Sequence, residues 1–496
     1  MPETPLAAED RRFFDLVADV IFANPFSTQY QEVAARLSEV TRLPASDSKQ
    51  RYLDAVAEIL CERLAQLAGR GIRRVGDVHP RDQKALEYVL LFRCYHSYNA
   101  AFDGLIETQL KRGDESVPVP FADELLGELA DCGVAALDAL RYISLFYQLR
   151  RAYHFIDQTL IGQSPCMVRL RHALWNNVFT TDIRTYGNQL WGRMEDFSTL
   201  LLGETGSGKG AAAAAIGRSG AIPFDPASGR FKASFTTSFI ATNLSQFPES
   251  LIESELFGHR KGAFTGAIDH HQGVFQRCSP HGALFLDEIG DVSLPTQIKL
   301  LNVLQERRFS PVGSHQVMKF SGRVIAATNR PLDRLRQEGR FREDFYYRLS
   351  SDVILVPSLR ERLAEQADEL DALLALLIQR MTGGQNTSLV EQARRALKAQ
   401  LPPNYPWPGN VRELEQAVRR VLLTGSYRPD LDSNLDANGP ADPWLEALTQ
   451  GQLSAQELLA GYCQRLYRQW GSYEKVAQQT GLDRRTAKKH IEACRL

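Results

Sequence analysis

Thr199-Leu200-Leu201-Leu202-Gly203-Glu204-Thr205-Gly206-Ser207-Gly208-Lys209-Gly210 is the stretch that organises this chain of 496 residues. It predicts a short strand, a glycine-rich loop and, from the alanines that follow, a helix. In that context the backbone N–H groups of the loop and the start of the helix face the phosphates of a nucleotide, while Lys209 supplies a point charge. The strict phosphate-loop motif ends in serine or threonine where this chain has Gly210. For this segment alone, an ordinary glycine turn is therefore the alternative.

Two carboxylates follow a second apolar stretch, about eighty residues after Lys209. Ala283-Leu284-Phe285-Leu286 is expected to be a buried strand that delivers Asp287 and Glu288 at its C-terminal end. Asp287 is suited to hold Mg²⁺ through water, and Glu288 to polarise an attacking water molecule. Taken alone, such a pair also fits a solvated strand end, but the phosphate loop at this separation favours a nucleotide site.

Polar residues beyond a third apolar stretch extend this candidate site. Val324-Ile325-Ala326-Ala327 precedes Thr328 and Asn329, and we expect Asn329 to meet the terminal phosphate and sense hydrolysis. Arg342 and Arg348 lie further along the chain. An arginine that reaches a phosphate across a subunit boundary supplies transition-state charge. Lone arginines on a helix are more often solvated, so these two are candidates only in the context of the rest.

Between the phosphate loop and the acidic strand lies the hexapeptide Gly262-Ala263-Phe264-Thr265-Gly266-Ala267. Two glycines bracket one large aromatic side chain and one hydroxyl among alanines, a composition typical of a tight, mobile loop. We therefore expect this loop to offer Phe264 to a partner outside the fold.

The pattern of apolar residues indicates a multidomain protein. We expect an all-α domain over residues 1–158, an α/β core with a parallel sheet over 159–358, a helical lid over 359–426, a linker over 427–446 and a helical C-terminal domain over 447–496. Apolar residues spaced by three and four predict N-terminal helices over Lys49–Leu67, Asp82–Lys111 and Ala135–Ile156. Short apolar strands that alternate with helical windows predict the α/β core.

The C-terminal domain has the spacing of a helix-turn-helix. Ala477 precedes Gly481 by four residues, apolar residues flank the turn, and Asp483 is a suitable N-cap for a second helix. That helix carries the residues expected to reach bases and phosphates in a major groove: Arg484, Arg485, Thr486, Lys488, Lys489 and His490. From Leu453 to Leu496 there are eight basic and four acidic side chains. A solvated basic helix in a small bundle is the alternative.

These motifs, together with Thr242-Asn243-Leu244 and Tyr405–Leu414, resemble the AAA+ domain of bacterial enhancer-binding proteins, the activators of sigma-54 RNA polymerase, over about residues 160–425. The resemblance implies that Gly262–Ala267 contacts sigma-54 through Phe264 and Thr265. It implies further site roles: Asp287 and Glu288 as the Walker B pair, Asn329 as the first sensor, Arg412 as the second sensor in the lid, Arg342 and Arg348 as candidate arginine fingers, and Asn243 as an asparagine that restrains Glu288 until the nucleotide state changes.

The same resemblance implies cofactors and partners. ATP and Mg²⁺ would lie between subunits of a ring, a hexamer or heptamer gathered from dimers, and hydrolysis would remodel the sigma-54 RNA polymerase holoenzyme into the open complex. The C-terminal segment resembles the Fis-type DNA-binding domain, which implies double-stranded DNA at upstream enhancer sites as a partner. Two alternative functions are considered: a DNA-binding repressor whose AAA+ fold only oligomerises, and a remodelling ATPase unrelated to transcription. The contact loop argues against both.

The chain departs from the family pattern in three places. Gly210 stands where the family usually has an acidic residue, which loosens the start of the phosphate-binding helix but leaves the backbone cradle and Lys209 in place. The segments Trp175–Phe197 and Gly220–Phe235 are longer than the family pattern.

Composition sets wider limits. Hydrophobic content of 44%, charged content of 24% and a net charge of −1 describe a globular protein without wholesale disorder. The seven cysteines contain no Cys-x-x-Cys pair, and the chain has no signal-peptide pattern and no long apolar run. We therefore expect a cytoplasmic protein with no membrane partner.

The N-terminal domain has the least specific pattern. No apolar strand ending in an acceptor aspartate precedes residue 158, so control by a phosphorylation receiver domain is not expected. Tyr95-His96-Ser97-Tyr98-Asn99 is a polar and aromatic cluster that indicates either ordinary packing or a ligand site. We expect this domain to bind an unknown ligand or protein and to restrain the ATPase.

Overall fold

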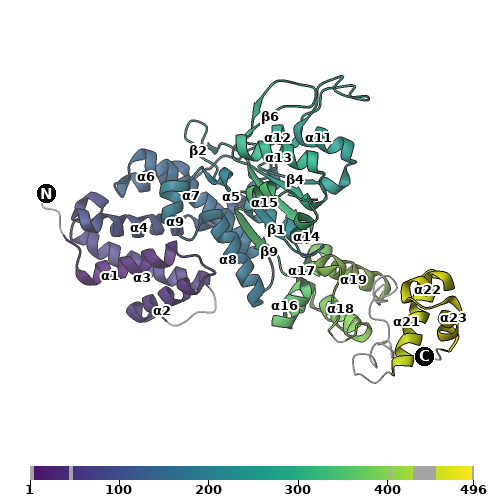
Figure 1. Cartoon of the computed structure of the whole chain (residues 1–496). Helices are drawn as coiled ribbons and strands as arrows, with labels where there is room; N and C mark the ends of the chain where they lie inside the picture. Colours follow the sequence, from purple (N-terminus) through teal and green to yellow (C-terminus); the bar gives the residue numbers. More distant parts are fainter. Residues whose placement is uncertain (1–4, 44–48, 403, 428–453, 494–496) are drawn as a thin grey trace. The chain divides into compact units, whose positions relative to one another are not determined.

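The computed structural model describes residues 5–43, 49–402, 404–427 and 454–493 (Figure 1). The chain forms two compact units, Met1–Tyr427 and Arg428–Leu496. Most of the expected linker over 427–446, and the first residues of the expected C-terminal domain, lie outside the described residues. Within the described part of the chain, no helix is both long and apolar enough to cross a membrane.

The first unit begins with helices only. Their bounds are α1 Ala8–Phe22, α2 Thr28–Thr41, α3 Lys49–Gly69, η1 Val75–Asp77, α4 Pro80–Ser97, α5 Asn99–Arg112, α6 Ala122–Asp131, α7 Ala136–Ala152 and η2 Tyr153–Gln158. The expected helix over Asp82–Lys111 is two helices, because the chain leaves helical geometry at Tyr98, with φ −102° and ψ 7°. The helix expected over Ala135–Ile156 ends as a π-helical turn.

A five-stranded parallel sheet forms the centre of the first unit, in the order β4-β5-β8-β1-β9. Its strands are β1 Thr199–Leu202, β4 Phe239–Asn243, β5 Ala283–Asp287, β8 Arg323–Thr328 and β9 Asp352–Leu355. All six residues of β8 are buried, as expected of a strand with helices on both faces. The parallel sheet predicted from the sequence is confirmed. Strands β4 and β9 were not predicted because neither has a long apolar run.

Helices and short hairpins surround the sheet. The helices are α8 Pro165–Phe179, α9 Ile183–Thr185, η3 Tyr186–Leu190, η4 Met194–Asp196, α10 Lys209–Gly217, η5 Leu244–Gln246, α11 Glu249–Phe257, α12 Val274–Arg277, η6 Ile289–Asp291, α13 Leu294–Glu306, α14 Leu332–Gln337 and α15 Glu343–Leu349. The hairpins are β2 Phe224–Asp225 with β3 Arg230–Phe231, and β6 Arg308–Phe309 with β7 Met318–Lys319.

One hydrophobic core joins the N-terminal helices to the sheet. Ile143 and Phe102 of these helices belong to the same buried cluster as Leu201 and Ile325 of the strands. The opposite face of the sheet packs a second cluster that includes Leu284 and Val324. The first cluster passes residue 158 without a break, and the N-terminal helices pack through η2 onto α8 and α10, which cover this face of the sheet.

The segment Gly220–Phe235, which departs from the family pattern, is part of this junction. The rings of Tyr147 in α7 and Phe231 in β3 stack with centroids 4.0 Å apart. The backbone N–H of Val119 donates to the carbonyl oxygen of Gly229 at 2.9 Å. The β2–β3 hairpin thus attaches the N-terminal helices to the core.

Four further helices form a lid after β9: α16 Leu359–Glu365, α17 Glu369–Thr382, α18 Thr387–Gln400 and α19 Asn410–Thr424. They have a core of their own that includes Leu374, Trp407 and Val418. Helix α16 begins with a capping box in which Ser358 and Glu361 satisfy each other's backbone N–H groups.

The second unit contains α21 Ala455–Trp470, α22 Tyr473–Thr480 and α23 Arg484–Ala493. Cys463, Val476, Ala487 and Ile491 form its buried core. Helices α22 and α23 are separated by Gly481, with φ +70°, and two residues. This tight connection fixes α23 against α21 and α22.

Candidate functional site

The glycine-rich loop runs from β1 into α10, as predicted. Gly206 and Gly208 have φ of +76° and +111°, which glycine adopts without the steric cost that a side chain brings. Lys209, the first residue of α10, donates from Nζ to the carbonyl oxygens of Gly203 at 2.9 Å and Glu204 at 3.1 Å. Burial lowers the pKa of the Lys209 ammonium, and the carboxylates of Glu288 and Asp287 oppose that effect.

Two buried oxygens of this region have no hydrogen-bond partner among the described residues. One is Oγ of Ser207 in the loop, and the other is Oε2 of Glu288 at the end of β5. Buried polar atoms are normally paired. Loop amides, a lysine, an orphaned hydroxyl and an orphaned carboxylate oxygen together fit a nucleotide phosphate group with its attacking water.

Glu288 has an unusual backbone and an unusual environment. Its φ of +57° lies in the left-handed region, which residues with side chains seldom adopt outside functional sites. Burial raises the pKa of its carboxyl group, and repulsion from Asp287 acts in the same direction, while Lys209 opposes both. The strand end therefore presents a carboxylate that takes up a proton more readily than an ordinary glutamate.

The lid packs directly against the loop. The backbone N–H of Val411 donates to the carbonyl oxygen of Gly206 at 3.1 Å. Nδ2 of Asn410 donates to Oε2 of Glu204 at 3.1 Å and to the carbonyl oxygen of Thr205 at 3.0 Å. Arg360 also pairs with Glu204, and its hydrogen bond lowers the pKa of that carboxyl group. The side chain of Glu204, predicted as part of the ATP site, thus binds the lid.

Asn410 and Arg360 were not predicted as site residues. Asn410 has φ +54° and is fully buried, and its Oδ1 accepts from the backbone N–H of Leu359 at 2.7 Å. The sequence signal was present in Pro406-Trp407-Pro408-Gly409, a rigid turn at the start of a helix. The role of Asn410 was missed because its partners in the phosphate loop, Glu204 and Thr205, lie about two hundred residues away in the chain.

Asn329 lies at the end of β8, beside the loop. Its Nδ2 donates to Oγ1 of Thr205 at 2.7 Å. Arg412 is exposed at the start of α19, and its charge lowers the pKa of Lys209. Asn329 thus contacts the phosphate loop and Arg412 lies near Lys209, while their roles as sensors stay predictions.

Asn243 lies next to the acidic pair but uses its side chain locally. It is in register with Asp287 on the neighbouring strand. Its Oδ1 accepts from the backbone N–H of Ser245 at 3.0 Å and from the Ser245 hydroxyl at 2.8 Å. In the described chain no hydrogen bond joins Asn243 to Glu288, so the predicted restraint stays a prediction.

The two candidate arginine fingers differ in their surroundings. Arg342 is the N-cap residue of α15, about two-fifths exposed, and its guanidinium pairs with Asp344 at 2.7 Å. Arg348 donates from Nε and Nη2 to the carbonyl oxygen of Leu304 at 3.0 and 2.6 Å. Arg342 is therefore the freer of the two to meet a neighbouring subunit.

The hexapeptide Gly262–Ala267 forms a closed turn. The backbone N–H of Gly262 donates to the carbonyl oxygen of Ala267 at 2.8 Å, and that of Ala267 to Phe264 at 3.0 Å. Thr265 is exposed, but Phe264 is only half-exposed, because its ring packs edge-on against His259 with centroids 4.9 Å apart. Phe264 thus rests partly on the stem of the loop, and its contact with a partner stays a prediction.

The basic helix of the second unit is capped as predicted. Oδ1 of Asp483 accepts from the backbone N–H groups of Arg485 at 2.9 Å and Thr486 at 3.0 Å. Arg484 makes an exposed ion pair with Glu474 at 3.2 Å. Most of the predicted DNA-contacting residues are exposed: Arg484, Arg485, Lys488 and Lys489, with Thr486 and His490 half-exposed.

The strand order, the phosphate loop, the acidic pair and the helical lid define a P-loop domain of the AAA+ class. A family model described as the sigma-54 interaction domain matches residues 187–354. The chain is 36% identical over 342 residues to the transcriptional regulatory protein ZraR of Klebsiella oxytoca, covering 66% of this chain and 67% of that protein. The chain belongs to the family of sigma-54-dependent enhancer-binding proteins.

Other relatives share the same central region. The anaerobic nitric oxide reductase transcription regulator NorR of Aeromonas hydrophila is 42% identical over 294 residues, 57% of this chain and 51% of that protein. The Nif-specific regulatory protein of Azotobacter vinelandii is 34% identical over 319 residues, 63% of this chain and 53% of that protein. The chain thus spans about half the length of these two relatives. A crystal structure of NtrX from Brucella abortus with ADP aligns over 76% of this chain and 81% of that chain, with 21% identity and a TM-score of 0.41.

Proposed function

We propose that this protein binds upstream DNA and uses ATP hydrolysis to activate transcription by sigma-54 RNA polymerase. One observation carries the proposal: a nucleotide site and the Gly262–Ala267 loop are joined by a short path in one folded unit. Strand β4 ends at Asn243 in register with Asp287, and the chain then passes through α11 to the loop.

Each residue of the proposed ATP site has a separate role. The amides of the loop and Lys209 bind phosphates, and Asp287 holds Mg²⁺ through water. Because Gly210 has no hydroxyl, the hydroxyl ligand that the strict motif offers to Mg²⁺ is missing here, and more of the binding falls on Asp287 and the phosphates. Bound ATP supplies the phosphoryl group that is cleaved. Glu288 orients and deprotonates the attacking water, and an arginine of a neighbouring subunit, Arg342 or Arg348, completes the site.

The nucleotide state reaches the loop through β4 and the lid. Asn329 bonds Thr205 of the phosphate loop, and a γ-phosphate that competes for Asn329 would break that bond. Asn243 is then placed to exchange its hydrogen-bond partner, from Ser245 to Glu288. This exchange would move helix α11, which follows Asn243 in the chain. Two arrangements of these side chains give two positions of Phe264 and Thr265 against sigma-54.

Two further interactions complete the proposal. The exposed basic residues of α23 support binding to double-stranded DNA at upstream sites, with a dimer reading two half-sites. Arginine fingers in trans require a ring, a hexamer or heptamer, for which upstream DNA helps to gather subunits. The N-terminal helices, which lack a strand in the described residues before β1, act as a control domain of a kind other than a receiver.

Open-complex formation tests this function. Purified protein is incubated with sigma-54 RNA polymerase holoenzyme and a promoter carrying upstream sites, with ATP or with a non-hydrolysable analogue. Promoter opening that requires hydrolysable ATP is expected. A repressor with a purely oligomerising AAA+ fold would give no opening with either nucleotide, and a remodelling ATPase unrelated to transcription would hydrolyse ATP without opening the promoter.

A further inference from the structure

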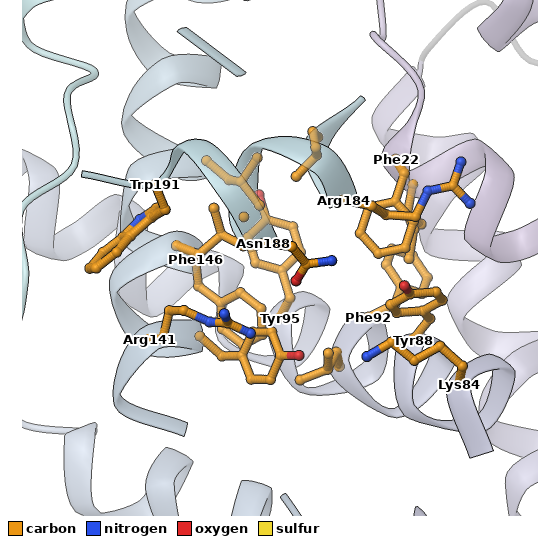
Figure 2. Close-up of a pocket in the computed structure, with 17 residues that line it drawn as sticks. Phe22, Lys84, Tyr88, Phe92, Tyr95, Arg141, Phe146, Arg184, Asn188 and Trp191 are labelled. Carbon is orange, nitrogen blue, oxygen red and sulfur yellow. The ribbon is translucent and has the colours of Figure 1, made fainter. Parts of the chain in front are cut away.

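An aromatic cavity lies between the N-terminal helices and the segment that precedes β1. Helices α1, α4 and α7 form most of its wall, and α9, η3 and Trp191, which follows η3, complete it. Its volume is about 80 Å³, roughly half that of a ~150 Å³ cavity that takes up benzene. The cavity therefore has room for no more than one aromatic ring, with the rest of a ligand at the rim. Figure 2 shows rings such as Phe92, Tyr95 and Phe146 around it.

Every charged side chain that lines this cavity is a cation. These residues are Lys84, Arg141 and Arg184, and Figure 2 draws Arg141 on one side of Asn188 with Lys84 and Arg184 on the other. Their acidic neighbours lie outside the lining: Glu87 is 2.7 Å from Lys84, Asp138 is 3.4 Å from Arg141 and Asp182 is 3.1 Å from Arg184. Arg184 also lies 3.5 Å from Asp19. The surface presented to a ligand is thus apolar in its body, and its rim offers guanidinium and ammonium donors that an anionic ligand would share with these acidic neighbours.

Trp191 adds an unpaired polar group beside the cavity. It lines the cavity, and its indole Nε1 is buried without a hydrogen-bond partner among the described residues. A buried donor normally has an acceptor. Because protein atoms cover this nitrogen, an acceptor inside the cavity would reach it only after the indole turns.

We propose that this cavity binds a small aromatic carboxylate, with the ring among the aromatic side chains and the carboxylate on the cationic rim. Arginine pairs with carboxylates through two parallel hydrogen bonds, and apolar walls with a few polar groups are typical of effector sites. A regulatory meaning of this binding rests on the function proposed above, but the binding itself does not.

Helix α7 connects the cavity to the nucleotide site. Tyr142 and Phe146 of α7 line the cavity. From the same helix, Nε2 of Gln148 donates to the carbonyl oxygen of Ser219 at 2.9 Å, and Arg151 binds the residues that follow α10. Because α10 begins at Lys209, one rigid helix touches both the proposed ligand and the phosphate-binding helix.

Calorimetry on the full-length protein without nucleotide tests the site. The probes are benzoate, phenylacetate and 3-phenylpropionate, each paired with its uncharged primary amide, and tryptophan fluorescence provides a second readout through Trp191. At least one acid is expected to saturate the protein, with a Kd about tenfold lower than that of its amide. Failure of all three acids to bind at about 10 mM, or equal binding of acid and amide, would overturn the proposal.

Two variants locate the binding. Arg141→Gln is expected to weaken the acid by about tenfold, whereas Arg112→Gln, which removes an exposed arginine with a similar i,i+3 acidic neighbour, leaves the Kd unchanged. Gly187→Leu fills the cavity, and the first carbon of the new side chain meets only Leu145 Cδ2 at 4.0 Å, so the fold is retained and binding is lost. Wild-type affinity in both Arg141→Gln and Gly187→Leu places the ligand elsewhere and refutes the site.

Because these measurements use neither ATP nor polymerase, their outcome is separate from the proposed function. If the protein binds the acid but does not open promoters, the ligand site is supported and the proposed activator function is refuted. If the protein opens promoters but binds none of the acids, the activator function is supported and the ligand site is refuted.

Discussion

Arg151 donates one hydrogen bond from its guanidinium to the carbonyl oxygen of Arg218 at 2.6 Å, immediately after the phosphate-binding helix α10. Its other terminal nitrogen donates to the carbonyl oxygen of Gly220 at 2.7 Å. The side chain is fully buried, rests on the ring of Tyr147, and burial lowers its pKa to about 10. An N-terminal helix therefore holds the end of the helix that carries Lys209.

The first prediction concerns this contact. Arg151→Lys keeps the charge but leaves at least one carbonyl without its donor, so the free energy of unfolding in urea should fall by about 1–3 kcal/mol. If the N-terminal helices restrain the ATPase, basal ATP turnover should rise by at least about fivefold, the low end of ordinary allosteric coupling. Arg112→Lys, an exposed arginine of the same region, is the control. Unchanged turnover in a destabilised Arg151→Lys protein would show that the contact is structural only.

The second prediction compares two glycines of the phosphate loop. A Cβ at Gly210 would meet only Phe285 Cε1 at 4.0 Å, so Gly210→Ala should stabilise the protein by about 0.5–1 kcal/mol through α10 and leave ATP affinity unchanged. A Cβ at Gly206 would lie 2.3 Å from the Gly409 carbonyl oxygen, at φ +76°, so Gly206→Ala should displace the lid and weaken ATP binding. Thermal unfolding and nucleotide titration measure both. Equal effects of the two changes would contradict the lid contact.

The sequence predicted the glycine-rich loop, the acidic strand end and the capped C-terminal turn because their signals are local. The loop at Lys209, the acidic pair after β5 and the capped turn at Asp483 each occupy a short stretch with its own spacing. The lid contact of Asn410 and the contact of Arg151 with Arg218 were not predictable, because each joins segments far apart in the chain and neither residue type is unusual at its position.

The packing of the N-terminal helices on the rest of the first unit was also not predictable from local patterns. A periodic pattern of apolar residues marks helices, but it does not say which face of which sheet they cover. Because the N-terminal helices share one core with α8 and α10, removal of residues 1–158 would expose apolar side chains of that core and would not release an intact ATPase. Point changes such as Arg151→Lys therefore replace deletion as the test of restraint.

The third prediction concerns Glu288. Glu288→Gln should bind ATP without turning it over, while Glu306→Gln, at an exposed position, should keep wild-type turnover.

Because burial and Asp287 raise the pKa of Glu288 above its ordinary 4.5, the folded protein binds the proton more tightly than the unfolded chain. Stability from this group is therefore present below pH 4.5 and is lost as the pH rises through the raised value. Glu288→Gln should melt slightly higher than wild type at pH 7.5, and the difference should vanish near pH 4. A higher melting temperature for wild type at pH 7.5 would contradict this environment.

The fourth prediction concerns the contact loop. Phe264→Ala should keep ATP turnover and abolish open-complex formation, at a stability cost of about 0.5–1.5 kcal/mol for the lost ring pair with His259. Ile268→Ala, beside the loop and 74% exposed, is the matched control and should keep both activities. Normal promoter opening by Phe264→Ala would remove Phe264 from the contact with sigma-54.

The last prediction concerns the basic helix α23. Arg484→Ala with Arg485→Ala should weaken binding to the upstream site by a few kcal/mol in total, at ~1–3 kcal/mol per good base contact. Part of the binding energy of Arg484 is offset because its ion pair with Glu474 must open first, so Arg485→Ala alone should cost more than Arg484→Ala alone. Lys475→Ala removes a basic residue from α22 of the same unit and is the control. Footprinting and titrations at several salt concentrations separate base contacts from phosphate contacts, because only lost phosphate contacts reduce the salt dependence of binding. An unchanged footprint for the double variant would leave α23 as a solvated basic helix.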